Sequence, residues 1–186
     1  MLLKIDWMIE ALISSKTRIK LLLKFFLNSG TRAYLRNLEV EFGESTNGIR
    51  LELNRLEEAG MLSSALDGNK KVFRANTKHP LFGEIHQIVM KYVGLDQVIE
   101  SVVEKLGEVE RVYLTGEFAQ GRNSQIIDLI FIGNLDKNYL IELIEKVEKL
   151  IGRKIRFLVF TEAEVEDSKW LSQQNDPLLL WSANHV

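Results

Sequence analysis

The short sequence Asp67-Gly68-Asn69-Lys70 constrains the fold of this 186-residue chain more than any other segment. Asp-Gly is a strong local signal for a β-hairpin, because a tight turn between antiparallel strands needs a residue that accepts a positive φ. The stretches on both sides, residues 61–66 and 71–75, have the length of short strands. We therefore predict a β-hairpin centred on this turn.

Three helical segments precede the hairpin. The first begins at Ser15, carries its apolar residues on one face and its lysines largely elsewhere, and ends at Asn28-Ser29-Gly30. The second is short and ends at Gly43, and the third begins at the capping pair Ser45-Thr46. Three helices followed by a hairpin predict a winged helix-turn-helix in residues 1–80.

The third helix is the one that we expect to face a nucleic acid. It buries the stripe Ile49, Leu53 and Leu56, so its other, polar stripe remains free to enter a major groove. Basic residues on the hairpin and near the second helix would contact phosphates. The predicted DNA-binding residues are Arg32, Arg36, Thr46, Asn47, Arg50, Asn54, Lys70 and Lys71. For each of them taken alone, an ordinary solvated side chain is the alternative.

The charges divide unevenly along the chain. Residues 1–80 hold 13 Lys or Arg against 9 Asp or Glu, whereas residues 81–186 hold 11 against 17. The boundary follows the connecting sequence Asn76-Thr77-Lys78-His79-Pro80. A basic module joined to an acidic one is typical of a DNA-binding part attached to a sensing or dimerising part.

In the second part, residues 81–186, the spacing of the apolar residues is different. Residues 81–107 show helical spacing and predict linking helices, and residues 108–186 alternate between strand and helix patterns. The helix over residues 136–151 is capped by Asp136, and its predicted buried face is Leu140, Ile141, Ile144, Val147 and Leu150. The apolar tail around Trp181 is expected to fold back onto another element. The whole predicts a two-domain chain of the α+β or α/β class, whose second domain holds a small mixed sheet.

Composition excludes several kinds of site. The chain has no cysteine, so disulfides, zinc fingers and cysteine nucleophiles are ruled out. The three histidines, at positions 79, 86 and 185, are too scattered to suggest a metal site, and nothing indicates a cofactor. No apolar run reaches the roughly 18 residues that cross a bilayer, and no signal peptide is evident, so we expect no membrane contact and a cytoplasmic location.

Two runs carry a resemblance to a known family. Residues 38–43, followed by Asn54-Arg55-Leu56-Glu57-Glu58-Ala59-Gly60-Met61-Leu62, resemble the helix, turn and recognition-helix signature of ArsR-like winged-helix repressors. The resemblance implies a homodimer that reads a two-fold symmetric site in double-stranded DNA. The apolar segment Leu2–Ile13 and the helices after Leu81 would suit the dimer contact, and packing between the two domains is the alternative.

The second domain resembles nucleotidyltransferase-fold domains, including those fused to an ArsR-like winged helix. The resemblance rests on the linker at residues 76–82 and on residues 113–122 and 127–133. Active members carry Gly-Ser and then two aspartates two residues apart, which hold magnesium against a nucleotide. Here Glu117 replaces the serine and Ile126 replaces the first aspartate.

The second aspartate is present as Asp128, but the strand over residues 155–160 lacks the third acid. We therefore expect a vestigial nucleotide pocket, formed by Gly116, Glu117, Gly121, Arg122 and Asp128, without a catalytic residue. Asp128 would pair with Arg122 or with another base. The pocket would bind a small anionic or nucleotide-like effector, unless the domain only packs and dimerises.

Three functions remain compatible with the sequence. The first is a DNA-binding transcriptional regulator that is not an enzyme, with a catalytically degenerate effector or dimerisation domain. The second is an active nucleotidyltransferase that carries its own DNA-binding module, and the third is a protein-interaction adaptor. Sequence-specific DNA binding would favour the first, and magnesium-dependent nucleotide turnover would favour the second.

Overall fold

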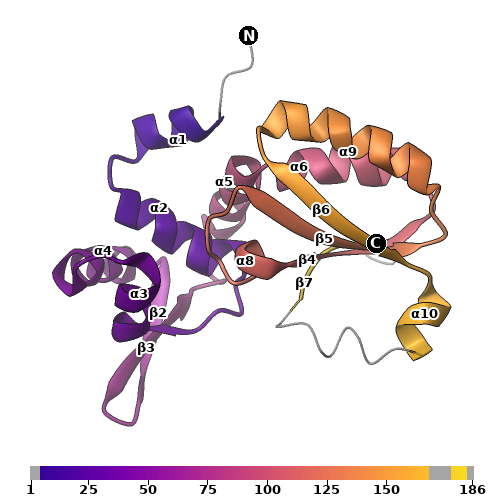
Figure 1. Ribbon diagram of the computed structural model, residues 1–186. Helices are drawn as coiled ribbons and strands as arrows, with labels where there is room; N and C mark the ends of the chain where they lie inside the picture. Colours follow the sequence, from indigo (N-terminus) through magenta and orange to yellow (C-terminus); the bar gives the residue numbers. More distant parts are fainter. Residues whose placement is uncertain (1–4, 168–176, 184–186) are drawn as a thin grey trace. The chain divides into compact units, whose positions relative to one another are not determined.

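The computed structural model describes residues 5–167 and 177–183 (Figure 1). The chain divides into two compact units, one formed by Ile5–Val89 and one that begins at Met90. The division falls inside the segment 81–107 that the sequence predicts as linking helices, within helix α5 (Phe82–Val93). None of the described helices has the length and apolar character needed to span a membrane.

The first unit contains three short strands among helices. Its elements are α1 (Ile5–Leu12), α2 (Lys16–Leu22), the π-helix η1 (Leu23–Leu27), β1 (Ala33–Tyr34), α3 (Leu35–Phe42), α4 (Thr46–Glu58), β2 (Leu62–Asp67), β3 (Lys70–Ala75) and the first part of α5. The strands form an antiparallel sheet in the order β1-β3-β2. Asp67 pairs with Lys70 across the turn, and Gly68 has φ of +61°, so the predicted hairpin is confirmed.

The α4 helix forms as its sequence predicts. The Ser45 side chain accepts a hydrogen bond from the backbone N–H of Gly48 at 3.2 Å, which caps the first turn. Ile49, Leu53 and Leu56 are buried, and Asn47, Arg50 and Asn54 on the other stripe are exposed. This helix therefore presents a polar face outside the core of the first unit.

The first predicted helix differs from its expected pattern. The α2 helix continues into η1, and every residue from Leu21 to Leu27 is buried, rather than one face alone. Lys24 is among them, because its ammonium group bonds to the Glu41 carboxylate at 2.9 Å. An amphipathic pattern could not reveal this partner, which lies on α3.

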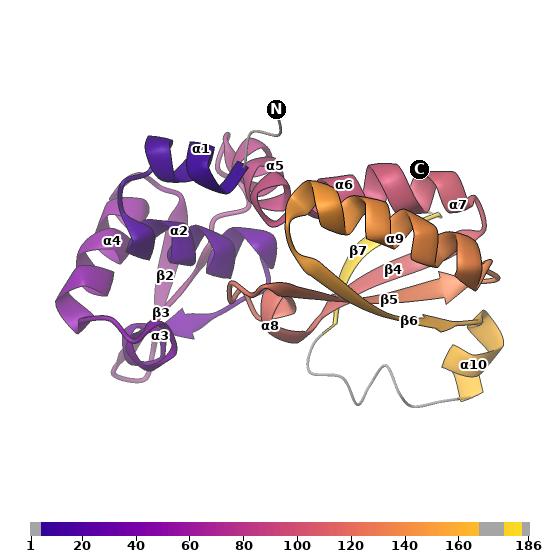
Figure 2. The same ribbon diagram turned by 45° about the horizontal axis from the view of Figure 1, so that its top comes forward.

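The second unit contains a four-stranded mixed sheet. Its elements are the end of α5, α6 (Leu95–Val98), the π-helix η2 (Ile99–Val103), α7 (Glu104–Leu106), β4 (Val109–Thr115), α8 (Gly116–Ala119), β5 (Ile126–Gly133), α9 (Lys137–Ile151), β6 (Lys154–Phe160), α10 (Glu162–Asp167) and β7 (Leu178–Ser182). The strand order is β6-β5-β4-β7, with β5 and β6 parallel and the other pairs antiparallel. Figure 2 shows α9 and α6 side by side over one face of this sheet.

The α9 helix connects the parallel strands β5 and β6. Asp136 caps it by accepting hydrogen bonds from two backbone N–H groups, as predicted. The predicted face is wrong at two positions, because Ile141 and Leu150 are each 46% exposed. The buried stripe instead has the helical spacing 140, 143, 144 and 147.

The apolar tail supplies the fourth strand of this sheet. Strand β7 pairs antiparallel with β4, and Leu178 lies opposite Leu114 while Trp181 lies opposite Val112. The expectation that the tail folds back is confirmed, and its target is the β4 edge. Strand β4 is thereby enclosed between β5 and β7.

Candidate nucleic-acid interface

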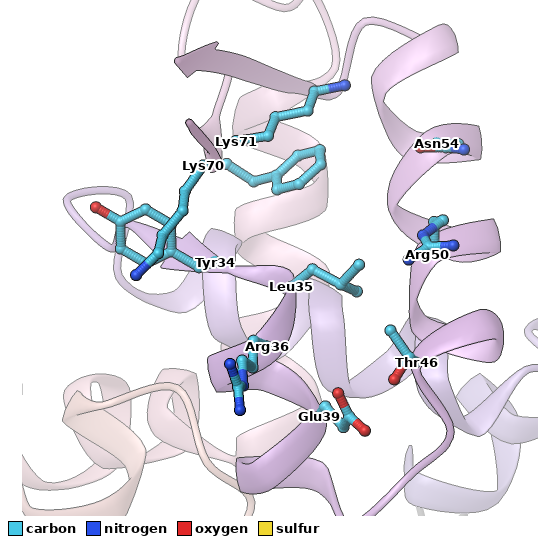
Figure 3. Close-up of a pocket in the computed structure, with 10 residues that line it drawn as sticks. Tyr34, Leu35, Arg36, Glu39, Thr46, Arg50, Asn54, Lys70 and Lys71 are labelled. Carbon is cyan, nitrogen blue, oxygen red and sulfur yellow. The ribbon is translucent and has the colours of Figure 1, made fainter. Parts of the chain in front are cut away.

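A cavity of about 490 Å³ lies within the first unit, between α3, α4 and β3 (Figure 3). Three of its lining residues come from α4, three from β3, and the others from α3 and the end of β1. They are Tyr34, Leu35, Arg36, Glu39, Thr46, Arg50, Asn54, Lys70, Lys71 and Phe73. The cavity is therefore built from segments separated by almost forty residues.

Local geometry explains why these side chains converge. Thr46, Arg50 and Asn54 are four residues apart on α4, so they share one face of the helix. Strand β1 pairs with β3, which sets Tyr34 opposite Val72 and brings the start of α3 beside the hairpin. In Figure 3, Glu39 on α3 points toward Thr46 on α4 across the cavity.

Three cations of the cavity lack a partner within the described part of the protein. There, the side chains of Arg36, Arg50 and Lys70 take part in no ion pair and no hydrogen bond. Arg55 on the same helix as Arg50 differs, since it bonds to the Glu52 carboxylate at 3.1 Å. The cavity thus offers positive charge that an external anion can meet.

Lys71, unlike these three cations, has an ionic partner within the first unit. Its ammonium group lies 2.6 Å from the Glu57 carboxylate and 5.0 Å from the centre of the Phe73 ring. The hydrogen bond from Lys71, with another from Ser64, holds the pKa of Glu57 below its ordinary value. A phosphate that approached Lys71 would therefore compete with a carboxylate already in place.

A side-chain hydrogen bond connects the turn end of the hairpin to β1. The Tyr34 hydroxyl donates a hydrogen bond to the Asp67 carboxylate, and this bond raises the pKa of Tyr34. Asp67 is paired with Lys70 in the register of the hairpin. The bond therefore restrains the position from which Lys70 extends.

The structure brings together most of the residues that the sequence singles out for DNA contact. Arg36, Thr46, Arg50, Asn54, Lys70 and Lys71 line the cavity. Arg32 and Asn47 lie outside its lining. Sequence reasoning missed Tyr34, Leu35, Glu39 and Phe73, because their contribution depends on the pairing of β1 with β3 and not on a local motif.

The second predicted site lies in the second unit, where β4 ends and β5 begins. Thr115 and Asp128 are register partners, and Gly116 follows with φ of +67°. A Cβ on Gly116 would lie 2.5 Å from Oδ2 of Asp128, so only glycine leaves room for this carboxylate. Gly121 is buried, and its backbone N–H bonds to the carbonyl of Phe118 in the turn after α8.

The charged side chains of this second site are paired with one another. Nε of Arg156 lies 2.6 Å from Oδ1 of Asp128, and Nη2 lies 3.0 Å from Oδ2. Arg122 bonds instead to Glu117, at 3.1 Å. The base that pairs with Asp128 is therefore Arg156, on the strand where active nucleotidyltransferases are expected to carry an acid.

Magnesium, which the nucleotidyltransferase resemblance implies, does not fit the donors at this site. Both oxygens of Asp128 accept hydrogen bonds from Arg156, and the Glu117 carboxylate is bonded to Arg122. Across residues 5–167 and 177–183, no cluster of three His, Cys, Asp or Glu side chains could hold a metal ion. We derive no metal-assisted step from this site.

Comparisons with known proteins find similarity to solved structures only. No family model and no curated protein matches the sequence. One solved structure that resembles it is described as a "putative nucleotidyltransferase" from Sulfolobus solfataricus, with 21% identity over 52% of this chain and 85% of that chain and a TM-score of 0.34. Another, a mutant of the toxin–antitoxin pair MntA–HpeT, has 19% identity over 48% of this chain and 73% of that chain and a TM-score of 0.38.

One expectation from the sequence is corrected by these comparisons. The sequence led us to expect that the chain is not an enzyme, whereas a solved structure described as a nucleotidyltransferase is similar to about half of it. We withdraw that expectation. The pairing of Asp128 with Arg156 describes the site and does not decide whether the protein is active.

Proposed function

We propose that the first unit is a winged helix-turn-helix that binds double-stranded DNA, and that the protein acts as a transcriptional regulator. The observation that carries this proposal is the cavity, which Arg36, Arg50 and Lys70 all line with no ionic partner among the described residues. Cations that no carboxylate neutralises bind phosphates and base edges at a lower cost in broken contacts.

The polar face of α4 would read bases in the major groove. An arginine can donate two hydrogen bonds to guanine, and an asparagine can bond in the same bidentate way to adenine. Arg50 and Asn54 are one helical turn apart and both are exposed, so the two side chains are available to neighbouring base pairs. Thr46 and Asn47, at the start of the same helix, would add contacts to a base or a phosphate.

The hairpin would contact the DNA backbone. Lys70 is exposed next to the turn, and Lys71 follows it on β3. Arg32 and Arg36, on either side of β1, would reach further phosphates. Such contacts fix the orientation of the module on the duplex and carry no sequence information themselves.

The ArsR-like resemblance implies a homodimer, and a homodimer would double the contact with DNA. Support comes from apolar side chains that remain exposed near the ends of the first unit: Leu12 at 79%, Leu81 at 54% and Ile88 at 49%. Large exposed aliphatic side chains favour a partner surface. A dimer would recognise two half-sites related by two-fold symmetry.

Binding to DNA is tested with the full chain and fragments from upstream of its own gene, at two salt concentrations and with unrelated competitor DNA. Retention of one fragment in the presence of competitor, with an affinity that falls steeply as salt rises, is the expected result. Weak and equal binding to every fragment would contradict the proposal. Sedimentation of the protein alone and with DNA reports whether it binds as a dimer.

Nucleotidyl transfer by the second unit is a second candidate. It is favoured by the packing of Gly116 against Asp128, which brings the loop after β4 onto a carboxylate of β5. The test is transfer of label from each nucleoside triphosphate, with magnesium or manganese, in the wild type and in Asp128→Asn. Transfer that Asp128→Asn abolishes would make this candidate the leading one, and the absence of transfer from all nucleotides would eliminate it.

A further inference from the structure

We propose that the cavity between α3, α4 and β3 also binds a small aromatic anion, meaning a planar apolar ring that carries a negatively charged group. This ligand class goes beyond the proposed DNA binding. Only the competition with DNA, described below, rests on the proposed function. Three properties of the cavity lead to this ligand class: its size, its apolar floor and its charged rim.

The size of the cavity suits a small molecule. Its volume of about 490 Å³ falls within the range of roughly 300–1,000 Å³ that is usual for small-molecule sites. A DNA duplex presents phosphates and sugars on its outside and cannot fill an apolar recess between secondary-structure elements. Bound DNA would therefore leave part of this cavity without an apolar occupant.

The floor of the cavity is apolar. Leu35 points into the space between α3 and α4 in Figure 3, and the rings of Tyr34 and Phe73 also line the cavity. The long carbon chains of Arg50 and Lys71 extend this apolar surface below their charged ends. A flat aromatic ring gains the most from such a floor, because it buries a large apolar area with little loss of conformational entropy.

The rim favours a negative charge on the ligand. Arg36, Arg50 and Lys70 have no ion pair among the described residues, so an anion meets them without first breaking a contact. Glu39 contributes a carboxylate to the lining, and it opposes the anion. Hydrogen bonds between charged groups of opposite sign are roughly twice as strong as neutral ones, so the charged group fixes the orientation of the ring.

Occupation of the cavity would regulate DNA binding. Arg50 would bond to the anion instead of a base edge, and Lys70 would be drawn toward it and away from a phosphate. A ligand that binds only the DNA-free form lowers the apparent affinity for DNA in proportion to its own saturation. The same surface would thus serve as both recognition face and effector site.

The experiment is isothermal titration calorimetry of the full chain with 2-naphthoate, with its neutral amide and with adenosine monophosphate. We expect 2-naphthoate to bind at least about tenfold more tightly than the amide, because the two differ mainly in charge. Adenosine monophosphate tests whether the ligand is a nucleotide. Tighter binding of this compound than of 2-naphthoate would identify the natural anion as a nucleotide. Binding of neither anion, or equal binding of acid and amide, would overturn the inference.

Three variants locate the site. Arg50→Ala should weaken 2-naphthoate binding about tenfold, and Arg55→Ala is the matched control, since it removes an arginine from the same helix outside the cavity. Glu39→Gln should tighten binding, a gain that misfolding could not produce. Equal affinities for the wild type and all three variants would contradict the location.

A competition assay separates this inference from the proposed function. If DNA binds specifically and 2-naphthoate displaces it, both are supported. Specific DNA binding without any binding of either anion would overturn the ligand site and leave the DNA proposal intact. Binding of 2-naphthoate by a protein that binds no DNA would support the ligand site and contradict the DNA proposal.

Discussion

The two candidate sites of this protein differ in what surrounds their charged side chains. In the cavity of the first unit, Arg36, Arg50 and Lys70 have no ionic partner among the described residues. In the second unit, Asp128 accepts hydrogen bonds from two nitrogens of the Arg156 guanidinium group, Nε and Nη2, and Glu117 is bonded to Arg122. An ion pair must be broken before either group can meet a ligand, so the first site is the better prepared for binding.

The largest expected effect comes from removing two cations of the cavity. We expect the double variant Arg50→Ala and Lys70→Ala to lower affinity for the specific DNA fragment by roughly a hundredfold or more, because it loses a base contact and a phosphate contact. Fluorescence anisotropy at fixed salt measures this. Arg55→Ala is the control, because Arg55 is already bonded to Glu52. An equal loss in the control would remove the distinction between free and paired cations.

A buried ion-pair network should matter more for stability than for binding. Glu52 is 5% exposed and bonds to Arg18 at 2.8 Å as well as to Arg55. We expect Glu52→Ala to lower the free energy of unfolding by about 2 kcal/mol, because it leaves the Arg18 guanidinium group without its buried partner. Urea denaturation measures the change. A loss under about 0.5 kcal/mol would show that the network contributes little.

The same carboxylate should make stability depend on pH. Burial, the largest single influence, raises the pKa of Glu52, but the hydrogen bonds from Arg18 and Ser15, together with the positive charges of Arg18 and Arg55, outweigh it and hold the pKa below its ordinary value. A lowered pKa in the folded state stabilises the fold at pH values above the unfolded pKa of about 4.3, and this contribution is lost as pH falls through the folded pKa. Glu52→Gln should flatten that acid limb of the stability curve, and an unchanged limb would assign it to other groups.

A smaller effect is expected where the second site is packed most closely. Gly116→Ala places a methyl group 2.5 Å from Oδ2 of Asp128 at a φ that disfavours alanine. We expect a loss of about 1–2 kcal/mol, because the variant adds backbone strain and pushes the carboxylate away from Arg156. Thermal unfolding reports the loss. Gly43→Ala is the control for φ alone, since a Cβ there meets no atom within 4 Å.

The smallest effect should follow from removing the exposed half of the second pair. The Arg156 side chain is 68% exposed, so Arg156→Ala should shift the unfolding temperature less than Glu52→Ala or Gly116→Ala. The variant also frees the Asp128 carboxylate. If label transfer from a nucleotide appeared only in Arg156→Ala, the pair would be a restraint on the second site rather than a permanent feature of it.

Local sequence signals predicted much of the fold. Asp67-Gly68 specified the hairpin, Ser45 and Asp136 specified two helix starts, and the stripe of Ile49, Leu53 and Leu56 specified which face of α4 is buried. Each of these depends on residues close together in the chain. Short-range hydrogen bonding and helical periodicity are therefore sufficient to predict them.

The sequence did not predict which side chains pair with each other. The helical pattern placed Lys24 away from the apolar face, because nothing local shows that α3 brings Glu41 to it. The tail around Trp181 was recognisably apolar, but its pairing with β4 depends on a strand edge almost seventy residues away. The candidate cavity shares this limitation, since Phe73 and Leu35 line the same space only because β1 pairs with β3.

The sequence by itself determined which elements form, where charge of each sign is concentrated, and that Asp128 stands without the acids expected beside it. Tertiary structure alone decided how the charges are paired: it joined Arg156 to Asp128 across β5 and β6 and left Arg50 and Lys70 facing a cavity. The physical reason is that turns and helices arise from neighbours in the chain. The partner of a charge is whichever group the folded chain brings within a few ångströms.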